Sequence, residues 1–185
     1  MNQMHSLPHF PIQTRTTHAH AFTLIELLVV IAIIAILASL LFPAVTVVSS
    51  SSKKTTAKNQ IIQIATAITS YEAEYGKLPS NSGTTVNPNL IAILTANDTN
   101  NNPRAISFID TSIWKSGKGG TNANGFCDPF NATNVYSVSL DTNSVNSQSN
   151  VALGGGFGVT NVTKHIMVWT TPLIGKTNVL IDSWD

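Results

Sequence analysis

The sequence contains a single cysteine, Cys127, so no disulfide can form within the chain. The fold therefore cannot depend on a framework of disulfides, which stabilises many small exported domains. We predict that Cys127 is a small buried apolar residue, and a disulfide between two copies in an oxidising compartment is the alternative.

Charge is scarce as well. Only 10% of the 185 residues are charged, and 10 Lys and Arg against 9 Asp and Glu give a net charge of +1. Proteins dedicated to nucleic acids normally carry a basic patch or stripe. We therefore expect no nucleic-acid partner.

The sequence also lacks a recognisable catalytic constellation. His165 is a lone histidine beside predicted strand residues, and we expect it to pack or to contact solvent. The glycine-rich stretch 153–158 has neither the Lys-Ser/Thr pair of a phosphate-binding loop nor the spacing of a dinucleotide-binding motif. We expect a flexible turn there, and a protein that is not an enzyme.

The sequence does contain one long apolar run. From Leu27 to Val45 only Ser39 and Pro43 interrupt it. As a helix the run would measure roughly 28 Å, about the thickness of the hydrocarbon core of a bilayer. A helix that is apolar on every side needs lipid or a large protein around it, and a chain of 185 residues does not easily supply the latter. We therefore predict a membrane-spanning helix, with a buried core helix as the alternative.

A carboxylate, Glu26, stands directly before this run. Left unpaired in lipid, a carboxylate costs about 2.5–3.5 kcal/mol near the centre of the bilayer. Solvation of Glu26 among the lipid headgroups is the simplest account of it for a membrane helix in general.

The residues around Glu26 resemble a known processing signal. Ala21 and Phe22, followed by Thr-Leu-Ile-Glu, an apolar helix and Pro43, are similar to the cleavage signal of type IV pilins and type II secretion pseudopilins. The resemblance implies that a prepilin peptidase cuts between Ala21 and Phe22 and that the new amino terminus is methylated. It also implies that the ammonium group of Phe22 in one subunit pairs with Glu26 of a neighbour, so that neither charge is buried alone.

A second helical pattern follows the apolar run. Apolar residues recur at spacings of three and four and form one stripe, made of Ile61, Ile64, Ala65, Ile68, Tyr71 and Tyr75. Gly76, followed by Pro79, marks the end of the helix. We expect one long helix that leaves the membrane and packs its second half on a C-terminal domain. Pro43 is expected to kink this helix, because proline removes a helical hydrogen bond.

The remainder of the chain predicts a small sheet. An irregular segment runs from 77 to 104, with a short apolar turn at 90–94. Strand candidates follow at 105–109, 135–140, 165–169 and 179–181. Short strands close to one another favour an antiparallel sheet with one face on the helix. The predicted fold class is α+β and pilin-like, a long N-terminal helix packed on a small C-terminal antiparallel sheet.

The predicted organisation has four parts, because the chain leaves room for one small soluble domain besides the span. They are a removed leader at 1–21, a transmembrane and assembly helix at 22–48, an amphipathic helix half at 49–76, and a C-terminal loop and antiparallel-sheet domain at 77–185.

The C-terminal half also resembles the pseudopilins, in particular the major ones. The similarity lies in the segments 71–79, 102–108, 128–136, 168–169 and 182–184. Several major pseudopilins bind calcium in a C-terminal loop, so the resemblance makes Ca²⁺, held by oxygen atoms, the one candidate cofactor. Asp128, Asp141 and Asp182 could contribute, but their spacing matches no loop rule, and aspartates in turns usually cap backbone N–H groups. We therefore assign no metal-binding residues.

The two signals for membrane orientation conflict. The positive-inside rule weighs Arg15 against Lys53, Lys54 and Lys58, and it would place the C-terminal domain in the cytoplasm. The resemblance implies the opposite orientation, and we follow it because the cleavage motif is the more specific signal. The expected location is the inner membrane, crossed once, with the C-terminal domain in the periplasm or in a surface filament.

These observations predict a structural subunit of a type II secretion pseudopilus, or of a related type IV pilus-like filament, that polymerises through its N-terminal helix to support protein secretion. The lack of the paired cysteines found in many pilins favours the pseudopilus. The expected partners are identical or related pilin-like subunits, prepilin peptidase, the inner-membrane assembly platform of the secretion or pilus machinery, and membrane lipid before assembly. The alternative is a bitopic membrane protein whose periplasmic domain binds a ligand or a partner.

Overall fold

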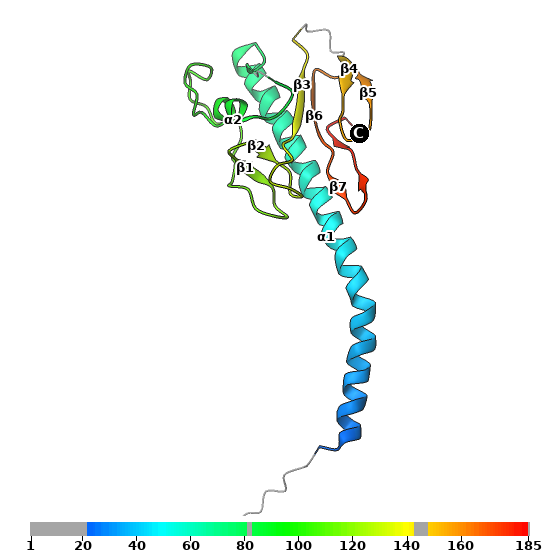
Figure 1. Cartoon of the computed structure of the whole chain (residues 1–185). Coiled ribbons are helices and arrows are strands. Elements are labelled where there is room, and N and C mark those ends of the chain that lie inside the picture. The colour runs from blue at the N-terminus through cyan, green and yellow to red at the C-terminus, as the bar shows by residue number, and fades with distance from the viewer. Residues whose placement is uncertain (1–21, 81–82, 143–147, 185) are drawn as a thin grey trace, which may run out of the picture. The chain divides into compact units, whose positions relative to one another are not determined.

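A computed structural model of the chain describes residues 22–80, 83–142 and 148–184 (Figure 1). The predicted leader, 1–21, lies outside the described residues, and Ala21 lies there with it. Within the described ranges there are two helices and nine short strands. The contacts divide the chain into two units at Pro43, and the first helix contributes residues to both.

The first helix, α1 (Leu24–Tyr75), is continuous over 52 residues. It passes through Pro43, so this proline does not end the helix, and the kink remains a prediction. After Tyr75 the chain turns at Gly76, whose φ of 66° lies in the left-handed region that favours glycine. The N–H of Gly76 donates to the carbonyl of Glu72 at 2.7 Å and closes the last turn. The predicted stop is confirmed.

The predicted apolar stripe on the second half of α1 forms one wall of the core. Ile61, Ile64, Ile68 and Tyr71 are buried, while Ala65 and Tyr75 are half-buried and pack against the same cluster. Burying one large apolar side chain stabilises the fold by roughly 1.5–3 kcal/mol. The stripe is therefore the surface on which the rest of this unit is built.

A short second helix, α2 (Pro88–Leu94), lies where the sequence predicted only an apolar turn. The side chain of Asn87 caps it by accepting a hydrogen bond from the N–H of Leu90 at 3.0 Å. Proline is favoured at the first helical position, which Pro88 occupies. Leu90, Ile93 and Leu94 are buried in the core with the α1 stripe, so packing completes what the cap begins.

The strands form four small antiparallel sheets. The largest has the order β3-β6-β9 and consists of β3 (Ser137–Leu140), β6 (Ile166–Thr170) and β9 (Ile181–Asp182). The others are hairpins: β1 (Gly120–Asn122) with β2 (Gly125–Cys127), β4 (Gln148–Ala152) with β5 (Val159–Val162), and β7 (Leu173–Ile174) with β8 (Thr177–Asn178).

Each face of the central sheet packs against a core. Successive side chains of β6 point to opposite faces and therefore enter different cores. Val168 pairs with Val138 of β3, and both belong to the core that includes the α1 stripe. Met167 and Trp169 point the other way into a smaller core, which also holds Leu153. Figure 1 shows β3 and β6 beside the second half of α1. The predicted α+β, pilin-like class is confirmed.

The strand predictions have mixed outcomes. Strands at 135–140 and 165–169 are confirmed as β3 and β6, and 179–181 only overlaps β9. The strand predicted at 105–109 is wrong. Ala105 has a left-handed φ of 49°, and the N–H groups of Phe108 and Ile109 both donate to the carbonyl of Leu94 at the end of α2. This segment satisfies its backbone by capping a helix rather than by joining a sheet.

Candidate functional site

The candidate site is the start of α1, where the processing signal meets the apolar helix. Phe22 and Thr23 precede the helix, and Glu26 lies in its first turn. The Thr23 hydroxyl oxygen accepts from the N–H of Glu26 at 3.3 Å, and the N–H of Thr23 donates to Oε2 of Glu26 at 2.8 Å. The Thr23 hydroxyl donates to the same Oε2 at 2.8 Å. This reciprocal arrangement is a capping box, which satisfies backbone N–H groups that a helix start leaves without partners.

The capping box is a role for Glu26 that the sequence analysis missed. Its signal, a threonine followed three residues later by a glutamate before an apolar run, is present in the sequence and would have identified Thr23. All the hydrogen bonds that Glu26 accepts from Thr23 end on Oε2. Among the residues that the structure describes, Oε1 accepts none, so Glu26 can close its own helix and still offer one oxygen atom.

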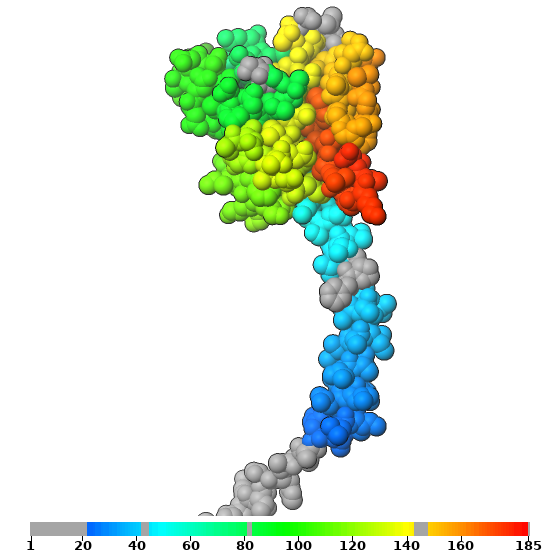
Figure 2. Space-filling view, in the orientation of Figure 1, coloured from blue at the N-terminus to red at the C-terminus, as the bar shows by residue number. Residues whose placement is uncertain are grey.

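The apolar side chains that follow Glu26 are exposed on every side of the helix. Between Leu24 and Leu41, the exposed fractions of the large apolar side chains range from 46% at Val30 to 88% at Leu24 (Figure 2). The helix is long and apolar enough to cross a membrane, and the described residues bury none of this stretch. A core helix would be covered by its own protein, so this surface is instead that of a helix that needs lipid or neighbouring helices.

One family model, the prokaryotic N-terminal methylation motif, matches residues 16–42. The match includes the predicted cut before Phe22, the capping box and most of the apolar run. The chain carries the prepilin-like signal of type IV pilins and pseudopilins. The search of the curated proteins gave no match, and neither did the search of the solved structures. The prepilin-like signal implies processing by a prepilin peptidase and assembly with other pilin subunits, and the family that carries it is structural.

Segments of the C-terminal half that resemble pseudopilins meet at the end of α1. The ring of Tyr71 lies 4.6 Å from that of Tyr75 and 5.6 Å from that of Phe108, measured between centroids. The hydroxyl of Tyr75 donates to Oδ1 of Asn102 at 2.6 Å. The segments 71–79 and 102–108 therefore form one packed cluster.

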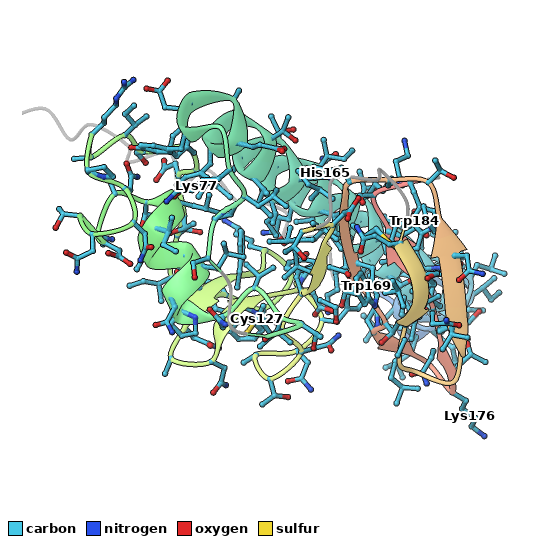
Figure 3. All side chains as sticks on the ribbon, turned by 90° about the horizontal axis from the view of Figure 1, so that it is seen from above. Lys77, Cys127, His165, Trp169, Lys176 and Trp184 are labelled. Carbon is cyan, nitrogen blue, oxygen red and sulfur yellow. The ribbon has the colours of Figure 1, made fainter. Side chains whose placement is uncertain are left out.

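His165, labelled in Figure 3, was expected to pack or to contact solvent, and it lies between two carboxylates. Its Nε2 is 2.8 Å from Oε1 of Glu72 on α1, and its Nδ1 is 3.7 Å from Oδ2 of Asp141, which follows β3. The side chain packs, with 19% of its surface exposed, and the fold brings it together with two carboxylates from distant segments. The contact ties the end of α1 to the start of β6, the middle strand of the central sheet.

Asp128, the first of the three aspartates considered for calcium, is buried and hydrogen-bonded. Its Oδ1 accepts from the N–H groups of Phe130 at 2.9 Å and Asn131 at 3.1 Å, and its Oδ2 accepts from the hydroxyl of Thr170 at 2.8 Å. Burial raises the pKa of the Asp128 carboxyl despite these donors. Asp128 thus caps its own turn, as isolated aspartates in turns usually do.

The other two aspartates have partners of their own. Oδ1 of Asp182 is 4.0 Å from Nζ of Lys58, and Asp141 lies beside His165. In residues 22–80, 83–142 and 148–184, no group of three His, Cys, Asp or Glu side chains is placed to hold a metal ion. The structure therefore does not bring the three aspartates together, and calcium stays a candidate without assigned ligands.

Cys127 is buried completely, as predicted. Its thiol donates to the carbonyl of Ala132 at 3.1 Å. Burial raises the pKa of the Cys127 thiol, which keeps it protonated and unreactive. The alternative of a disulfide between copies would require this side chain to reach the surface.

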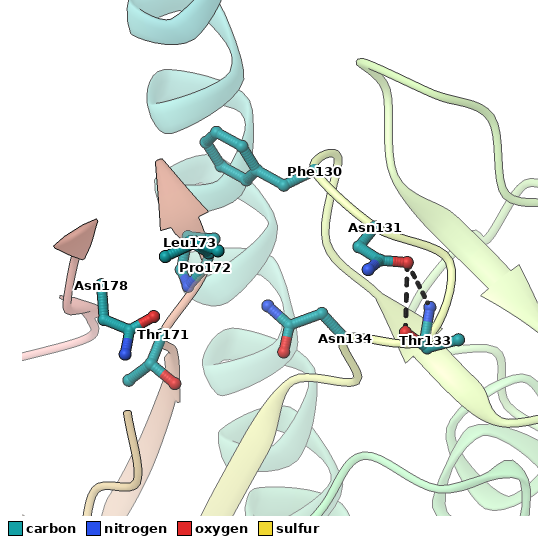
Figure 4. Close-up of a pocket in the computed structure, with 8 residues that line it drawn as sticks. All are labelled: Phe130, Asn131, Thr133, Asn134, Thr171, Pro172, Leu173 and Asn178. Carbon is teal, nitrogen blue, oxygen red and sulfur yellow. Dashed lines mark hydrogen bonds between the residues drawn. The ribbon is translucent and has the colours of Figure 1, made fainter. Parts of the chain in front are cut away.

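One cavity of about 380 Å³ opens between the turn after β2 and the β7–β8 hairpin (Figure 4). Phe130, Pro172 and Leu173 supply its apolar wall, and amides and hydroxyls supply the rest, from Asn131, Thr133, Asn134, Thr171 and Asn178. None of these eight lining residues is charged. Such a cavity suits a neutral molecule better than an ion.

Proposed function

We propose that this chain is a membrane-inserted structural subunit of a type II secretion pseudopilus, or of a related type IV pilus-like filament, and that it polymerises through the first half of α1. The observation that carries the proposal is the combination at the start of α1. A capped Glu26 within a prepilin-like signal opens a helix whose apolar surface is exposed all round.

The exposed surface supports a filament core made of these helices. Apolar side chains leave lipid at little cost only if other apolar side chains replace the lipid around them. A bundle of such helices from neighbouring copies supplies that replacement. In the bundle each copy keeps its own capping box between Thr23 and Glu26.

The capping box also supports a defined register between copies. Thr23 holds Oε2 of Glu26, which fixes the orientation of the carboxylate and leaves Oε1 for a partner. After cleavage, Phe22 would carry an ammonium group, and the side chain of Phe22 is 76% exposed. An ammonium group of one copy paired with Oε1 of the next would leave neither charge unpaired in the bundle.

The choice of a pseudopilus over a pilus rests on the C-terminal unit. The sequence has a single cysteine, so it has no pair of cysteines to close a C-terminal loop as many pilins do. The packing of Tyr71, Tyr75 and Phe108 joins two of the segments that resemble major pseudopilins.

A pair of substitutions tests this function. Glu26→Gln keeps an oxygen that can accept from Thr23, so it preserves the capping box and removes only the charge. We expect this variant to insert and to be cleaved, but to give filaments at a yield lower by about ten-fold or more. The matched control, Thr23→Ala, keeps the charge and the backbone N–H that holds Oε2, loses only the hydroxyl contacts, weakens the cap by about 1 kcal/mol and should leave the yield nearly unchanged. Normal filaments from Glu26→Gln would overturn the proposed pairing.

The second candidate is a bitopic membrane protein that binds a neutral ligand in the cavity beside Phe130. Sequencing the amino terminus of protein extracted from membranes separates the two functions. Phe22, with or without a methyl group, supports the filament subunit, whereas an intact Met1 supports the bitopic receptor.

A further inference from the structure

Five lysines gather around the part of α1 that directly follows the apolar run. We call them the basal lysines: Lys53, Lys54, Lys115, Lys118 and Lys176. Among the described residues, the ion pairs of lysine and arginine involve Lys58 and Arg104, and none involves a basal lysine. Four of the five are exposed, and Lys53 is half-buried. This end of the unit therefore carries positive charge that the described chain does not neutralise.

The loop with Lys115 and Lys118 lies directly against α1. Nε2 of Gln60 donates to the carbonyl of Lys118 at 2.8 Å. A Cβ atom built on Gly117 would lie 3.9 Å from Cε of Lys53. The loop and the helix thus present their lysines on neighbouring surfaces.

The hairpin with Lys176 borders the same stretch of α1. A groove of about 420 Å³ separates Leu173, Ile174 and Gly175 from residues 45–53 of the helix, and Phe130 lies beside it. Figure 2 shows this hairpin, in red, next to the cyan part of α1. Nζ of Lys53 lies 5.8 Å from the centre of the Phe130 ring, a cation–π contact at the rim of this groove.

Exposed apolar side chains accompany the lysines. Ile113, two residues before Lys115, is 79% exposed, and Leu173, three residues before Lys176, is 64% exposed. On α1 itself, Val45, Val47 and Val48 are 65–67% exposed. Apolar tips flanked by lysines are the composition of surfaces that lie in the interface of a membrane.

The distance along the helix places Lys53 and Lys54 just beyond the layer of lipid headgroups. Lys53 and Lys54 follow Val48 by five and six residues, or roughly 7.5–9 Å along α1. The polar layer on each side of the hydrocarbon core is about 5–7 Å thick. Long flexible lysine side chains reach across the remaining gap.

We propose that this basal face binds the anionic phosphate groups of membrane lipids while the subunit is inserted and not yet assembled. The proposal rests on the membrane-inserted state in the proposed function. The basal lysines attract the phosphates, and Ile113 and Leu173 enter the interface beside them. Lys53 and Lys54, two of the three lysines that oppose the positive-inside rule, are thus part of a folded face turned toward lipid.

The carboxylates of a second copy of the chain suit the basal lysines less well than lipid phosphates do. Carboxylates at the other end of the unit already serve partners within the chain: Glu72 contacts His165, and Glu74 pairs with Arg104. Oδ1 of Asp98 accepts from the N–H groups of Asn100 at 3.0 Å and Asn101 at 3.2 Å. Lipid phosphates have no such partners within the chain and can bind the basal lysines.

The test measures how close the basal face lies to headgroups in the full chain. Thr177→Cys, in the β7–β8 hairpin, is labelled with a fluorophore that cannot cross membranes. Only protein whose C-terminal unit faces the outside of the vesicle is therefore labelled. The buried Cys127 stays unlabelled. The protein is placed in vesicles of phosphatidylcholine alone or with phosphatidylglycerol, each doped with a headgroup spin label. We expect stronger quenching with phosphatidylglycerol, and loss of the difference at high salt, where the screening length falls to about 3 Å.

Substitutions identify the side chains responsible. Each of Lys115→Gln, Lys118→Gln and Lys176→Gln should lower the ratio of bound to unbound hairpin about five-fold. Lys77→Gln and Lys164→Gln are the matched controls, because both lysines are exposed and lie near the far end of α1, and they should change nothing.

Two results would overturn the proposal. Equal quenching in both vesicles would show that lipid charge has no role. Quenching that depends on the protein-to-lipid ratio, and not on phosphatidylglycerol, would assign the basal face to a second copy. Cleavage before Phe22 and filament yield are scored separately, so failure of the basal face is distinguishable from failure of the proposed function.

Discussion

Replacing Asn102 with alanine should destabilise the C-terminal unit strongly. The side chain is fully buried and makes four hydrogen bonds. Its Nδ2 donates to the carbonyls of Ile93 at 2.8 Å and Ile106 at 2.7 Å. Its Oδ1 accepts from the N–H of Ile106 at 3.1 Å and from the hydroxyl of Tyr75 at 2.6 Å. The amide thus joins α1, α2 and the segment that caps α2.

The magnitude follows from what alanine leaves behind. A hydrogen bond contributes about 0.5–1.5 kcal/mol net, and a buried polar group that loses its partner costs about 1–3 kcal/mol. Since the partners on Ile93 and Ile106 are backbone groups that cannot turn away, we expect the free energy of unfolding to fall by about 3–5 kcal/mol. Tyr75→Phe removes one of the four bonds and should cost about 1 kcal/mol.

The assay is urea unfolding of the full chain in detergent, followed by tryptophan fluorescence. The three tryptophans are Trp114, Trp169 and Trp184, so the signal reports on the C-terminal unit and not on the apolar helix. Asn100→Ala is the matched control, because Asn100 is exposed and bonds to Asp98 through its backbone N–H. A loss of less than about 1.5 kcal/mol in Asn102→Ala, or an equal loss in the control, would refute the reasoning.

Four further predictions concern other parts of the chain. Ala21→Leu should block cleavage and leave the precursor in the membrane, so mature-sized protein on a gel would contradict processing at this bond. Pro43→Ala should insert normally but give filaments of altered rise or lower yield, because it removes the predicted kink; filaments that imaging cannot distinguish from the parent would deny the proline this role. Because burial raises the pKa of Cys127, its thiol should react with a maleimide only after unfolding, and labelling of the folded protein would contradict its burial. Gly125→Ala should cost about 2–4 kcal/mol in urea unfolding, since its φ is 135° and a Cβ would lie 2.4 Å from the carbonyl oxygen of Val86; an unchanged midpoint would disprove this.

The parts of the fold that could be predicted from the sequence depend on local patterns. The stripe from Ile61 to Tyr75 was predictable because its period of three and four residues is written in one segment. The same holds for β6, a short apolar run, and for β3, in which serine alternates with apolar residues. The pair β1 and β2 was missed because each has only three residues and depends on distant groups. The N–H of Phe126, for example, donates to the carbonyl of Val86 at 2.9 Å.

The residues of the candidate site also differ in how far they could be predicted from local patterns. Phe22 and Glu26 were predictable because a processing signal is contiguous, and Thr23 could have been added from its spacing to Glu26. The contact of His165 with Glu72 joins residues 93 positions apart, and no local pattern indicates it. Contacts of this kind depend on the register of strands and helices in the finished fold, which a single sequence does not specify.

The bond between Lys58 and the last strand has a consequence for how the protein is made. Nζ of Lys58 donates to the carbonyl of Asp182 at 2.7 Å, across 124 positions in the chain. The segment that completes the core beside α1 is therefore synthesised long after the helix it covers. Until it arrives, the stripe around Ile61 remains open to water and to other unfinished chains, and contacts between such distant segments form slowly. The newly synthesised chain is thus most exposed to aggregation and proteolysis before β9 joins β6, and a chaperone that shields α1 during that interval would protect it.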